Sequence, residues 1–391
     1  MPEYLSPGVY VEEIVAALKP IEGVSTSTVG FVGRTEHIKN SDFDNDTLLD
    51  TPTLITSWAE FVGSFGRYDK EQAPYLPPAM KGFFENGGTR CFVVRVRQGA
   101  TDGEYVGTDE PDGKKTGLRA FMEIDEVKIL CVPGVTSSAV QQAMIAHCES
   151  MRYRFCILDS QENANVDVVA AQRGALSSEK GFGALYFPWI KVSIEVTVNG
   201  QTQLIQDFVP PSGHIAGIYA RTDREKGVHK APANALVQGA LETRVPVTRG
   251  GQEFLNNQGI NTLRSFPGRG IHVWGARTFS TDPEWKYVNI RRLAIFIEES
   301  IDRGTQWVVF EPDDENTWAR VRAAVTDFLT QLWRDGALFG VKAEEAFLVR
   351  CDRTTISQDD IDNGRVIILI GIAAIKPAEF IILRIEQQTV K

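Results

Sequence analysis

The sequence has few cysteines and no long apolar run, and each shortage excludes a class of protein. Its five cysteines are an odd number scattered through apolar stretches such as Arg90–Val94, so we expect buried free thiols rather than disulfides or metal ligands. No window approaches the roughly 20 apolar residues of a membrane helix, so we expect no membrane insertion. Glu3, Glu12 and Glu13 lie where a signal peptide would be basic or apolar, so synthesis in the cytoplasm is expected.

Positive charge is also in short supply. The 41 Lys and Arg residues are outnumbered by 51 Asp and Glu residues, and the formal net charge is −10. General nucleic-acid binders collect phosphate contacts from clustered Lys and Arg, whereas the basic residues here are interleaved with acidic ones. We therefore expect no nucleic-acid partner, and the expected partners are other proteins.

No motif for catalysis or ligand binding has the spacing that its chemistry requires. The segment Asp112–Thr116 looks like a phosphate loop, but five residues rather than four separate Gly107 from Gly113. The segment Asp359–Gly364 looks like a calcium loop, but Ile361 stands where the third-position carboxylate should be. The five histidines have no metal-ligand spacing, and no Gly-x-Ser-x-Gly sequence occurs. The sequence predicts no cofactor, no metal and no catalytic activity.

Strands and helices alternate through the first two thirds of the chain, which indicates an α/β domain over residues 28–260. The Gly- and Asp-rich segment 99–116 lacks apolar periodicity and is expected to be a surface loop. Residues 191–208 alternate up to Asn199-Gly200, the dipeptide that suits a two-residue hairpin turn. The turn-rich segment 212–259 is expected to wrap around this domain.

The last third predicts two long helices and a sheet on which they lie. Apolar residues follow helical spacing from Ile290 to Gly304, and a second helix with an apolar stripe is capped by Asp313 or Asp314. The runs 366–370 and 380–383 are apolar at consecutive positions, so we expect both of their faces to be covered. The candidate strands are Ile271–Trp274, Gln306–Phe310, Ala346–Arg350, Val366–Ile375 and Phe380–Ile385.

The opening of the chain reads as a turn at Pro7-Gly8 followed by a short alternating strand, with no turn that folds it back. The final apolar strand ends six residues before the last residue. Both are terminal strands that could pair outside their own subunit.

Several long stretches resemble one known family. They are SPGVYVEEI at the start, GIYARTDREKGVHKAPAN at 217–234, GINTLRSFPGRGIHVWGARTFS from residue 259, and IGIAAIKPAEFIILRIEQ near the end. The sequence resembles the tail sheath proteins of contractile phages and phage-tail-like injection particles, and the resemblance covers most of the chain. A phage tail, a tailocin and an extracellular injection particle all fit it.

The resemblance implies an α/β (α+β) fold in two domains. An N-terminal arm, residues 1–27, joins an inner domain, residues 261–378, whose mixed sheet is flanked by helices and completed by strands from neighbours. The outer α/β domain, residues 28–260, is inserted between them, and residues 379–391 form a C-terminal strand-exchange arm. The residues that would exchange strands are Val9, Tyr10, Val11, Glu12, Phe380, Ile381, Ile382, Leu383, Arg384 and Ile385.

The resemblance also implies a function without chemistry. Subunits would stack as hexameric rings around an inner tube, with baseplate and terminator or cap proteins as further partners, and contract to drive the tube through a target cell envelope. Linkers at Ser25 and Pro377 would act as hinges. The expected tube contacts are Arg320, Arg322, Asp327 and Arg334. Assembly is expected in the cytoplasm of the producing bacterium, followed by a place in a virion tail or a released particle.

Two other functions stay open at this point. A static shell or non-contracting tail protein would share strand exchange but would not change length. An α/β enzyme would need a convergent catalytic set, and the Gly-rich segment 99–116 is its best support.

Overall fold

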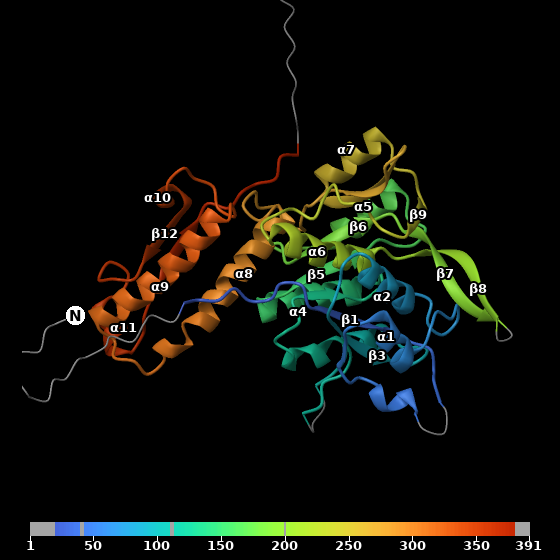
Figure 1. Cartoon of the computed structure of the whole chain (residues 1–391), viewed down its shortest axis with the longest axis horizontal. Coiled ribbons are helices and arrows are strands. Elements are labelled where there is room, and N and C mark those ends of the chain that lie inside the picture. The colour runs from blue at the N-terminus through green and yellow to red at the C-terminus, as the bar shows by residue number, and fades with distance from the viewer. Residues whose placement is uncertain (1–19, 40–42, 110–112, 199–200, 380–391) are drawn as a thin grey trace, which may run out of the picture. The chain divides into compact units, whose positions relative to one another are not determined.

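The computed structural model describes residues 20–39, 43–109, 113–198 and 201–379 (Figure 1). They divide into two compact units. The small unit holds the described residues up to Glu22 together with Ser300–Ala373, and the large unit holds Gly23–Glu299 and the described residues from Ala374 onward. Each unit is described by itself.

An eight-stranded sheet forms the centre of the large unit, in the order β11-β10-β6-β5-β4-β1-β3-β2. Its strands are β1 (Val29–Arg34), β2 (Thr53–Ile55), β3 (Cys91–Val96), β4 (Ile129–Cys131), β5 (Phe155–Asp159), β6 (Gly183–Phe187), β10 (Ile260–Phe266) and β11 (Gly270–Trp274). The six inner strands are parallel, while β2 and β11 run antiparallel at the two edges. Every residue of β3 and β5 is buried, as expected for parallel strands covered on both faces.

Helices cover this sheet. They are α1 (Trp58–Phe65), α2 (Leu76–Glu85), α3 (Asp102–Val106), α4 (Ser138–Met151), α5 (Val166–Gly174), α6 (Ser212–Lys226) and α7 (Arg249–Asn257), with short 3-10 helices at Asn45–Leu48 and Gly117–Glu123. Side-chain oxygens cap several of them, for example Ser57 at α1 and Ser137 at α4. Helices α2 and α6 pack on each other and contact β1, β4 and β5, while α4 packs against β5.

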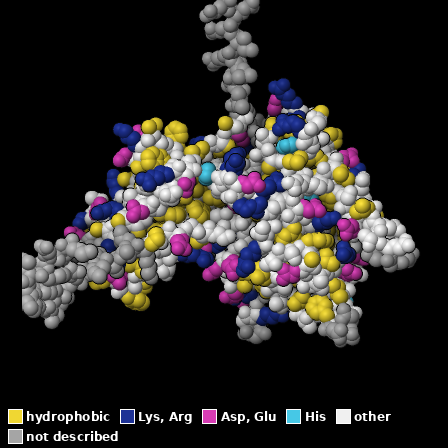
Figure 2. Space-filling view, viewed as in Figure 1, with side chains coloured by type: hydrophobic (Ala, Val, Ile, Leu, Met, Phe, Trp, Pro, Cys, Tyr) yellow, Lys and Arg dark blue, Asp and Glu magenta, His cyan; other side chains and the backbone are white. Residues whose placement is uncertain are grey.

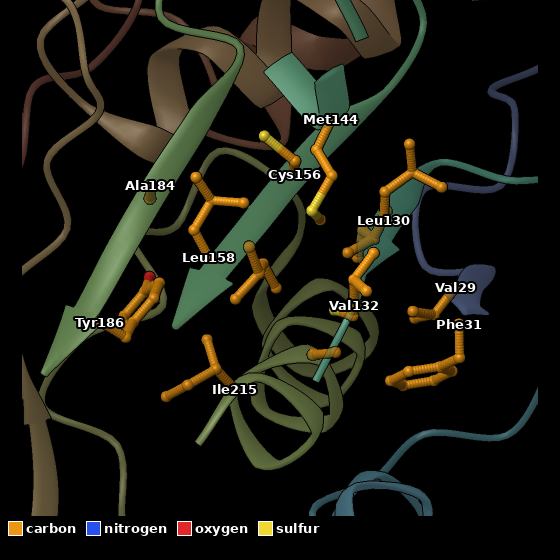
Figure 3. Packing of buried hydrophobic residues seen from close by; sticks show 14 of the residues in the cluster. Val29, Phe31, Leu130, Val132, Met144, Cys156, Leu158, Ala184, Tyr186 and Ile215 are labelled. Carbon is orange, nitrogen blue, oxygen red and sulfur yellow. The ribbon is translucent and has the colours of Figure 1, made fainter. Parts of the chain in front are cut away.

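The core of the large unit is apolar and continuous. Figure 3 shows part of it around β4, β5 and β6, with Val29, Phe31, Leu130, Val132, Met144, Cys156, Leu158, Ala184, Tyr186 and Ile215. All five cysteines of the chain are buried and free, which confirms the interpretation of them as thiols that pack rather than pair.

A second, three-stranded antiparallel sheet is attached to the large unit. It consists of β7 (Ile190–Val198), β8 (Gln201–Val209) and β9 (Ala240–Thr243) in the order β8-β7-β9. Val198 pairs with Gln201, so the predicted hairpin with a two-residue connection is confirmed. The hairpin projects away from the large sheet (Figure 1).

Three predictions for this unit are wrong. The segment 99–116 was expected to be a loop, but it holds the short helix α3, which Thr101 and Glu104 start with a capping box. The segment 212–259 contains α6, and its small residues are helical contacts rather than turns: a Cβ at Gly213 would lie 2.2 Å from the Ala79 carbonyl oxygen of α2. Residues 271–274 form a strand as predicted, but β11 pairs with β10 in the large sheet and not with the C-terminal strands.

Helix α8 (Val288–Gly304) begins in the large unit and ends in the small one. The small unit continues with α9 (Glu315–Arg334), α10 (Ala343–Ala346), β12 (Phe347–Arg350), α11 (Gln358–Asp362) and β13 (Leu369–Ile372). Asp314 caps α9 through the Thr317 amide, which confirms the predicted start. Trp318, Cys351 and Ile356 form a small buried core.

Two strand predictions for the small unit are wrong. Residues 306–310 form a 3-10 helix, Gln306–Val308, and a turn in which the Glu311 amide donates to the Val308 carbonyl. Phe310 has φ 70 and is fully exposed, so this apolar run turns instead of extending. Of the expected strand 366–375, the part that forms a strand is β13. Just beyond it, the Ala373 amide still donates to the Ala346 carbonyl, and the Ala373 carbonyl accepts from the Phe339 amide.

Candidate functional site

The sheet of the small unit has open edges. Within the described part of the chain, β12 and β13 pair only with each other, with Phe347 opposite Ile372. A two-stranded sheet is marginally stable alone, and an edge strand offers unpaired backbone donors and acceptors. This sheet is therefore a surface on which a strand of another chain can add.

The same sheet displays apolar side chains. Leu348 in β12 is 44% exposed and Leu369 in β13 is 50% exposed, and Ile367, two residues before β13, is 40% exposed. Both faces of the run 366–370 were expected to be covered. Within the described residues only one face is: Val366 and Ile368 pack against the small core, whereas Ile367 and Leu369 are exposed. Exposed apolar side chains on an unpaired sheet are typical of an interface that another chain buries.

The segment before residue 380 is held to the large unit by Arg277, Tyr287 and Glu379, which we call the C-terminal anchor. Arg277 Nε donates to Glu379 Oε1 at 2.9 Å and Nη2 donates to Oε2 at 2.5 Å. The Tyr287 hydroxyl donates to Oε2 at 3.3 Å. Burial raises the pKa of Glu379, but the hydrogen bond and charge of Arg277 outweigh it and leave the pKa lowered. The carboxylate is therefore ionised at neutral pH.

Asn289 adds a second contact to this segment. It lies in the first turn of α8 and is buried, and its Nδ2 donates to the His229 carbonyl at 2.8 Å and to the Ile375 carbonyl at 3.1 Å. Pro377, the predicted C-terminal hinge, lies between Ile375 and Glu379. Both flanking residues are therefore bound to the large unit.

The segment after residue 22 is held by Thr26, Asp223 and Arg292, which we call the N-terminal anchor. Arg292 donates from Nη1 to Asp223 Oδ1 at 2.8 Å and from Nη2 to Oδ2 at 2.6 Å, and Nη2 also donates to the Thr26 carbonyl at 3.0 Å. The Thr26 hydroxyl donates to Asp223 Oδ2 at 2.6 Å. Burial lowers the pKa of Arg292, but the charge of Asp223 outweighs it and raises that pKa.

Ser25, the predicted N-terminal hinge, lies beside this anchor. It lines a cavity of about 10 Å³ together with Val24, Lys128 and Glu299. Lys128 Nζ and Glu299 Oε1 form a buried ion pair at 2.5 Å. Glu299 is the last residue of α8 that belongs to the large unit. The ion pair therefore attaches this part of α8 to Lys128, the residue just before β4.

Two of the four predicted tube contacts are engaged inside the small unit. Arg320 pairs with Glu311 at 3.1 Å and lies 4.4 Å from the centre of the Trp307 ring. Arg322 Nη1 donates to the Cys351 carbonyl at 3.1 Å. Arg320 therefore binds the segment before α9, and Arg322 binds the residue that follows β12.

Asp327 and Arg334 are exposed on α9. They are seven residues apart, which is two helical turns, so they lie on the same face. Of the predicted tube contacts, these two are the most accessible to another protein. The predicted strand-exchange residues, 9–12 and 380–385, lie outside the described residues.

One cluster offers ligand atoms for a cation. Nitrogen and oxygen atoms of His37, Asp44 and Asp46 lie within 4.8 Å of one another. However, Lys39 Nζ is 2.9 Å from Asp44 Oδ2, and Arg95 Nη1 is 2.8 Å from Asp46 Oδ1. Because both carboxylates already have cationic partners, the cluster is explained as an ion-pair network around a short 3-10 helix.

The anchor residues were not predicted from the sequence. Arg277 and Glu379 are 102 positions apart, so no local pattern connects them. A weaker signal existed in α8, where Asn289, Arg292 and Glu299 follow helical spacing beside the apolar stripe. Polar residues repeated at the edge of a buried stripe can indicate buried polar contacts.

Together, the open sheet edges and the exposed apolar side chains are typical of a structural protein that assembles with other chains. Figure 2 shows acidic and basic side chains mixed over one face of the large unit. Among the helices of the described ranges, none combines the length and the hydropathy of a membrane-spanning segment.

Comparisons with known proteins identify the family. The phage tail sheath protein central domain matches residues 107–279, and the phage tail sheath C-terminal domain matches residues 280–388. The tail sheath protein of Escherichia phage P2 is 27% identical over 327 residues, which cover 78% of this chain and 77% of that protein. The chain belongs to the tail sheath family.

Solved structures agree over nearly the whole chain. The helical sheath of the anti-feeding prophage in its contracted state has a TM-score of 0.78 at 34% identity, covering 98% of this chain and 100% of that one. The contracted sheath complex of PVC, an extracellular contractile injection system, has a TM-score of 0.78 at 30% identity, covering 99% of both chains. The protein is a contractile sheath subunit, and the predicted mixed α/β fold is confirmed.

Proposed function

We propose that this chain polymerises as stacked hexameric rings around an inner tube and contracts to drive the tube through a target cell envelope. The observation that carries the proposal is the sheet of β12 and β13, which has free edges and exposed apolar side chains in the described chain. Similarity to sheaths solved in a contracted state supports the contraction step.

The missing strands would come from the ends of neighbouring chains. In strand addition, main-chain hydrogen bonds join the chains while alternate side chains fill pockets. Burying the five apolar residues Phe380–Leu383 and Ile385 would contribute on the order of 7 to 15 kcal/mol. Ordering each residue costs about 1 to 2 kcal/mol, so the net is about a few kcal/mol per arm. Repeated over every subunit, this gives a continuous mesh.

The proposed domains follow the family. The family division would give an inner domain of residues 1–27 and 261–378, an outer domain of residues 28–260 and an exchanged arm of residues 379–391. The compact units divide instead after Glu299, because β10 and β11 complete the sheet of the large unit. Ser25 and Pro377 remain the hinge candidates. Ser25 adjoins the anchored Thr26, and Pro377 lies two residues from both Ile375 and Glu379, which are bound. Motion at either hinge would therefore require an anchor to open.

The tube contact would be the exposed face of α9. Asp327 and Arg334 are its accessible charged residues, and charged side chains at a protein interface set register and partner choice more than affinity. Arg334→Glu is expected to prevent assembly of sheath on tube, whereas Arg249→Glu, on the exposed part of α7, serves as the control. Normal sheath assembly on the tube with Arg334→Glu would count against this contact.

The proposed function requires no catalysis, nucleotide or metal, since the energy of contraction would be stored in subunit packing. Baseplate and terminator or cap proteins would be further partners. Assembly would take place in the cytoplasm of the producing bacterium, before the sheath becomes part of a virion tail or a released particle.

Electron microscopy of the chain expressed with its cognate tube protein tests the proposal. Cylinders that shorten and widen on triggering are expected. Cylinders of fixed length would indicate a static tail protein, and the absence of any polymer would refute the sheath assembly proposed here. Deleting residues 380–391 should abolish long cylinders, and their persistence would refute strand exchange through this arm.

A further inference from the structure

The chain passes from the small unit to the large unit just before its last segment. β13 ends at Ile372 in the small unit, and Ala374 onward belongs to the large unit. Glu379 is therefore the last described point at which the chain is bound before residues 380–391. The distance over which residues 380–391 can extend is therefore measured from Glu379.

We propose that the C-terminal anchor positions the C-terminal arm, by fixing the point from which residues 380–391 leave the large unit. This inference rests on the proposed strand exchange and assigns it three positioning residues, Arg277, Tyr287 and Glu379. Twelve extended residues reach about 40 Å, whereas a chain free from Ile372 onward would reach about 60 Å. The anchor removes that slack.

The geometry is suited to fixing a direction as well as a position. Two parallel hydrogen bonds join the guanidinium and the carboxylate, and such bidentate pairs define the orientation of both groups. The Arg277 side chain is 7% exposed and that of Glu379 is 17% exposed. This shielding distinguishes the pair from surface ion pairs, which contribute little.

Arg277 is itself held on all sides. The Asn261 side chain fixes the Arg277 backbone. The Arg277 amide donates to Asn261 Oδ1 at 2.6 Å, and the Arg277 carbonyl accepts from Asn261 Nδ2 at 2.8 Å. Its Nη1 donates to the Asn256 carbonyl at 2.6 Å. The guanidinium is therefore pre-positioned by β10 and α7, and Glu379 binds to a fixed partner.

A fixed departure point has a consequence for contraction. When one subunit moves, a slack tether would first straighten and pass no displacement to its neighbour. With Ile375 bound by Asn289 and Glu379 bound by Arg277, residues 374–379 cannot lengthen the tether. Movement of the large unit is then transmitted directly through the arm to the chain that receives it.

The test uses the full chain with two engineered cysteines, Lys180→Cys and Ala378→Cys, both at exposed positions of the large unit. The five native cysteines are buried, so spin labels attach selectively. Pulsed electron–electron distance measurements and electron microscopy with the cognate tube protein are compared for the parent, Glu379→Gln and Glu253→Gln. Glu253 lies in an exposed ion pair with Arg249 and is the matched control.

The parent and Glu253→Gln should give one narrow distance distribution and contractile cylinders. Glu379→Gln should broaden the distribution at least twofold and should abolish long cylinders or stop contraction from spreading along them. The double variant Arg277→Gln with Glu379→Gln removes both charges, so it leaves no uncompensated buried charge and should behave in the same way even if Glu379→Gln alone folds poorly.

An unchanged narrow distribution in both anchor variants would overturn the inference, and so would cylinders of normal length and contraction. If the parent itself forms no contractile cylinders, the proposed function fails. The distance measurement then still decides whether Glu379 fixes the segment, because it does not depend on assembly.

Discussion

Replacing Asp223 with Asn tests the N-terminal anchor directly. The carboxylate accepts two hydrogen bonds from Arg292 and one from the Thr26 hydroxyl. Asn keeps one oxygen but turns an NH2 group toward a donor and removes the negative charge. The Arg292 side chain, only 4% exposed, would be left without its counter-charge.

The expected loss can be ranked from the structure. Removing one partner of a buried ion pair destabilises by about 3 to 5 kcal/mol, so Asp223→Asn should lower the free energy of unfolding by that amount. Thr26→Val removes a single hydrogen bond to a charged acceptor and should lower it by about 1 to 3 kcal/mol. Arg292→Met combined with Asp223→Leu removes both charges and should be less destabilising than Asp223→Asn.

Urea denaturation of the full chain before assembly, followed by far-ultraviolet circular dichroism, measures these losses. Because the chain has two compact units, the transitions of the units are fitted separately, and only the larger unit should respond. Glu253→Gln, in the exposed pair with Arg249, is the control and should change the stability by less than about 0.5 kcal/mol.

Two outcomes in the order of these stability losses would refute the predicted role of the N-terminal anchor. If Asp223→Asn lowers the free energy of unfolding no more than Glu253→Gln does, water solvates the Arg292 guanidinium once the Asp223 carboxylate is removed. The N-terminal anchor then does not hold Thr26. If the double replacement is more destabilising than Asp223→Asn, packing rather than charge holds this site.

Three further outcomes are expected. Burial and Arg154 lower the pKa of His147 from 6.5 to about 3. The neutral side chain therefore stabilises the fold above pH 6.5, and this stability is lost as the pH falls toward 3, by up to about 1.4 kcal/mol per pH unit. His147→Gln should flatten this pH dependence in urea titrations. Gly213→Ala should destabilise by about 1 to 3 kcal/mol because α2 backbone occupies the Cβ position, whereas Gly250→Ala, with open space there, should not. Leu369→Ser should leave monomer stability nearly unchanged but reduce cylinder formation; unchanged assembly would refute its interface role.

The parts of the fold that the sequence predicted are those in which local pattern and burial agree. The strand Cys91–Val96 is apolar at nearly every position and is buried at all of them, and the cap at Asp314 starts α9 as expected. In these places, each residue's own preference matches the environment that it enters.

The failures have tertiary causes. Glycines in α6 suggested turns, yet Gly213 and Gly217 permit the close approach of α2, which no local pattern encodes. The run Gln306–Phe310 has strand composition, but its residues are half-buried or exposed and form a turn. The C-terminal anchor joins residues 102 positions apart, so only the folded chain brings them together.

Helix α8 holds both segments of the chain that lead toward the proposed arms. Asn289 holds Ile375 on the way to the C-terminus, and Arg292, one turn later on the same face, holds Thr26 on the way from the N-terminus. A helix is stiff over one turn, so the two departing segments are fixed relative to each other by its first turn. If the two arms exchange strands as proposed, displacement that arrives through one arm must move α8, and with it the other arm, before either proposed hinge can absorb it.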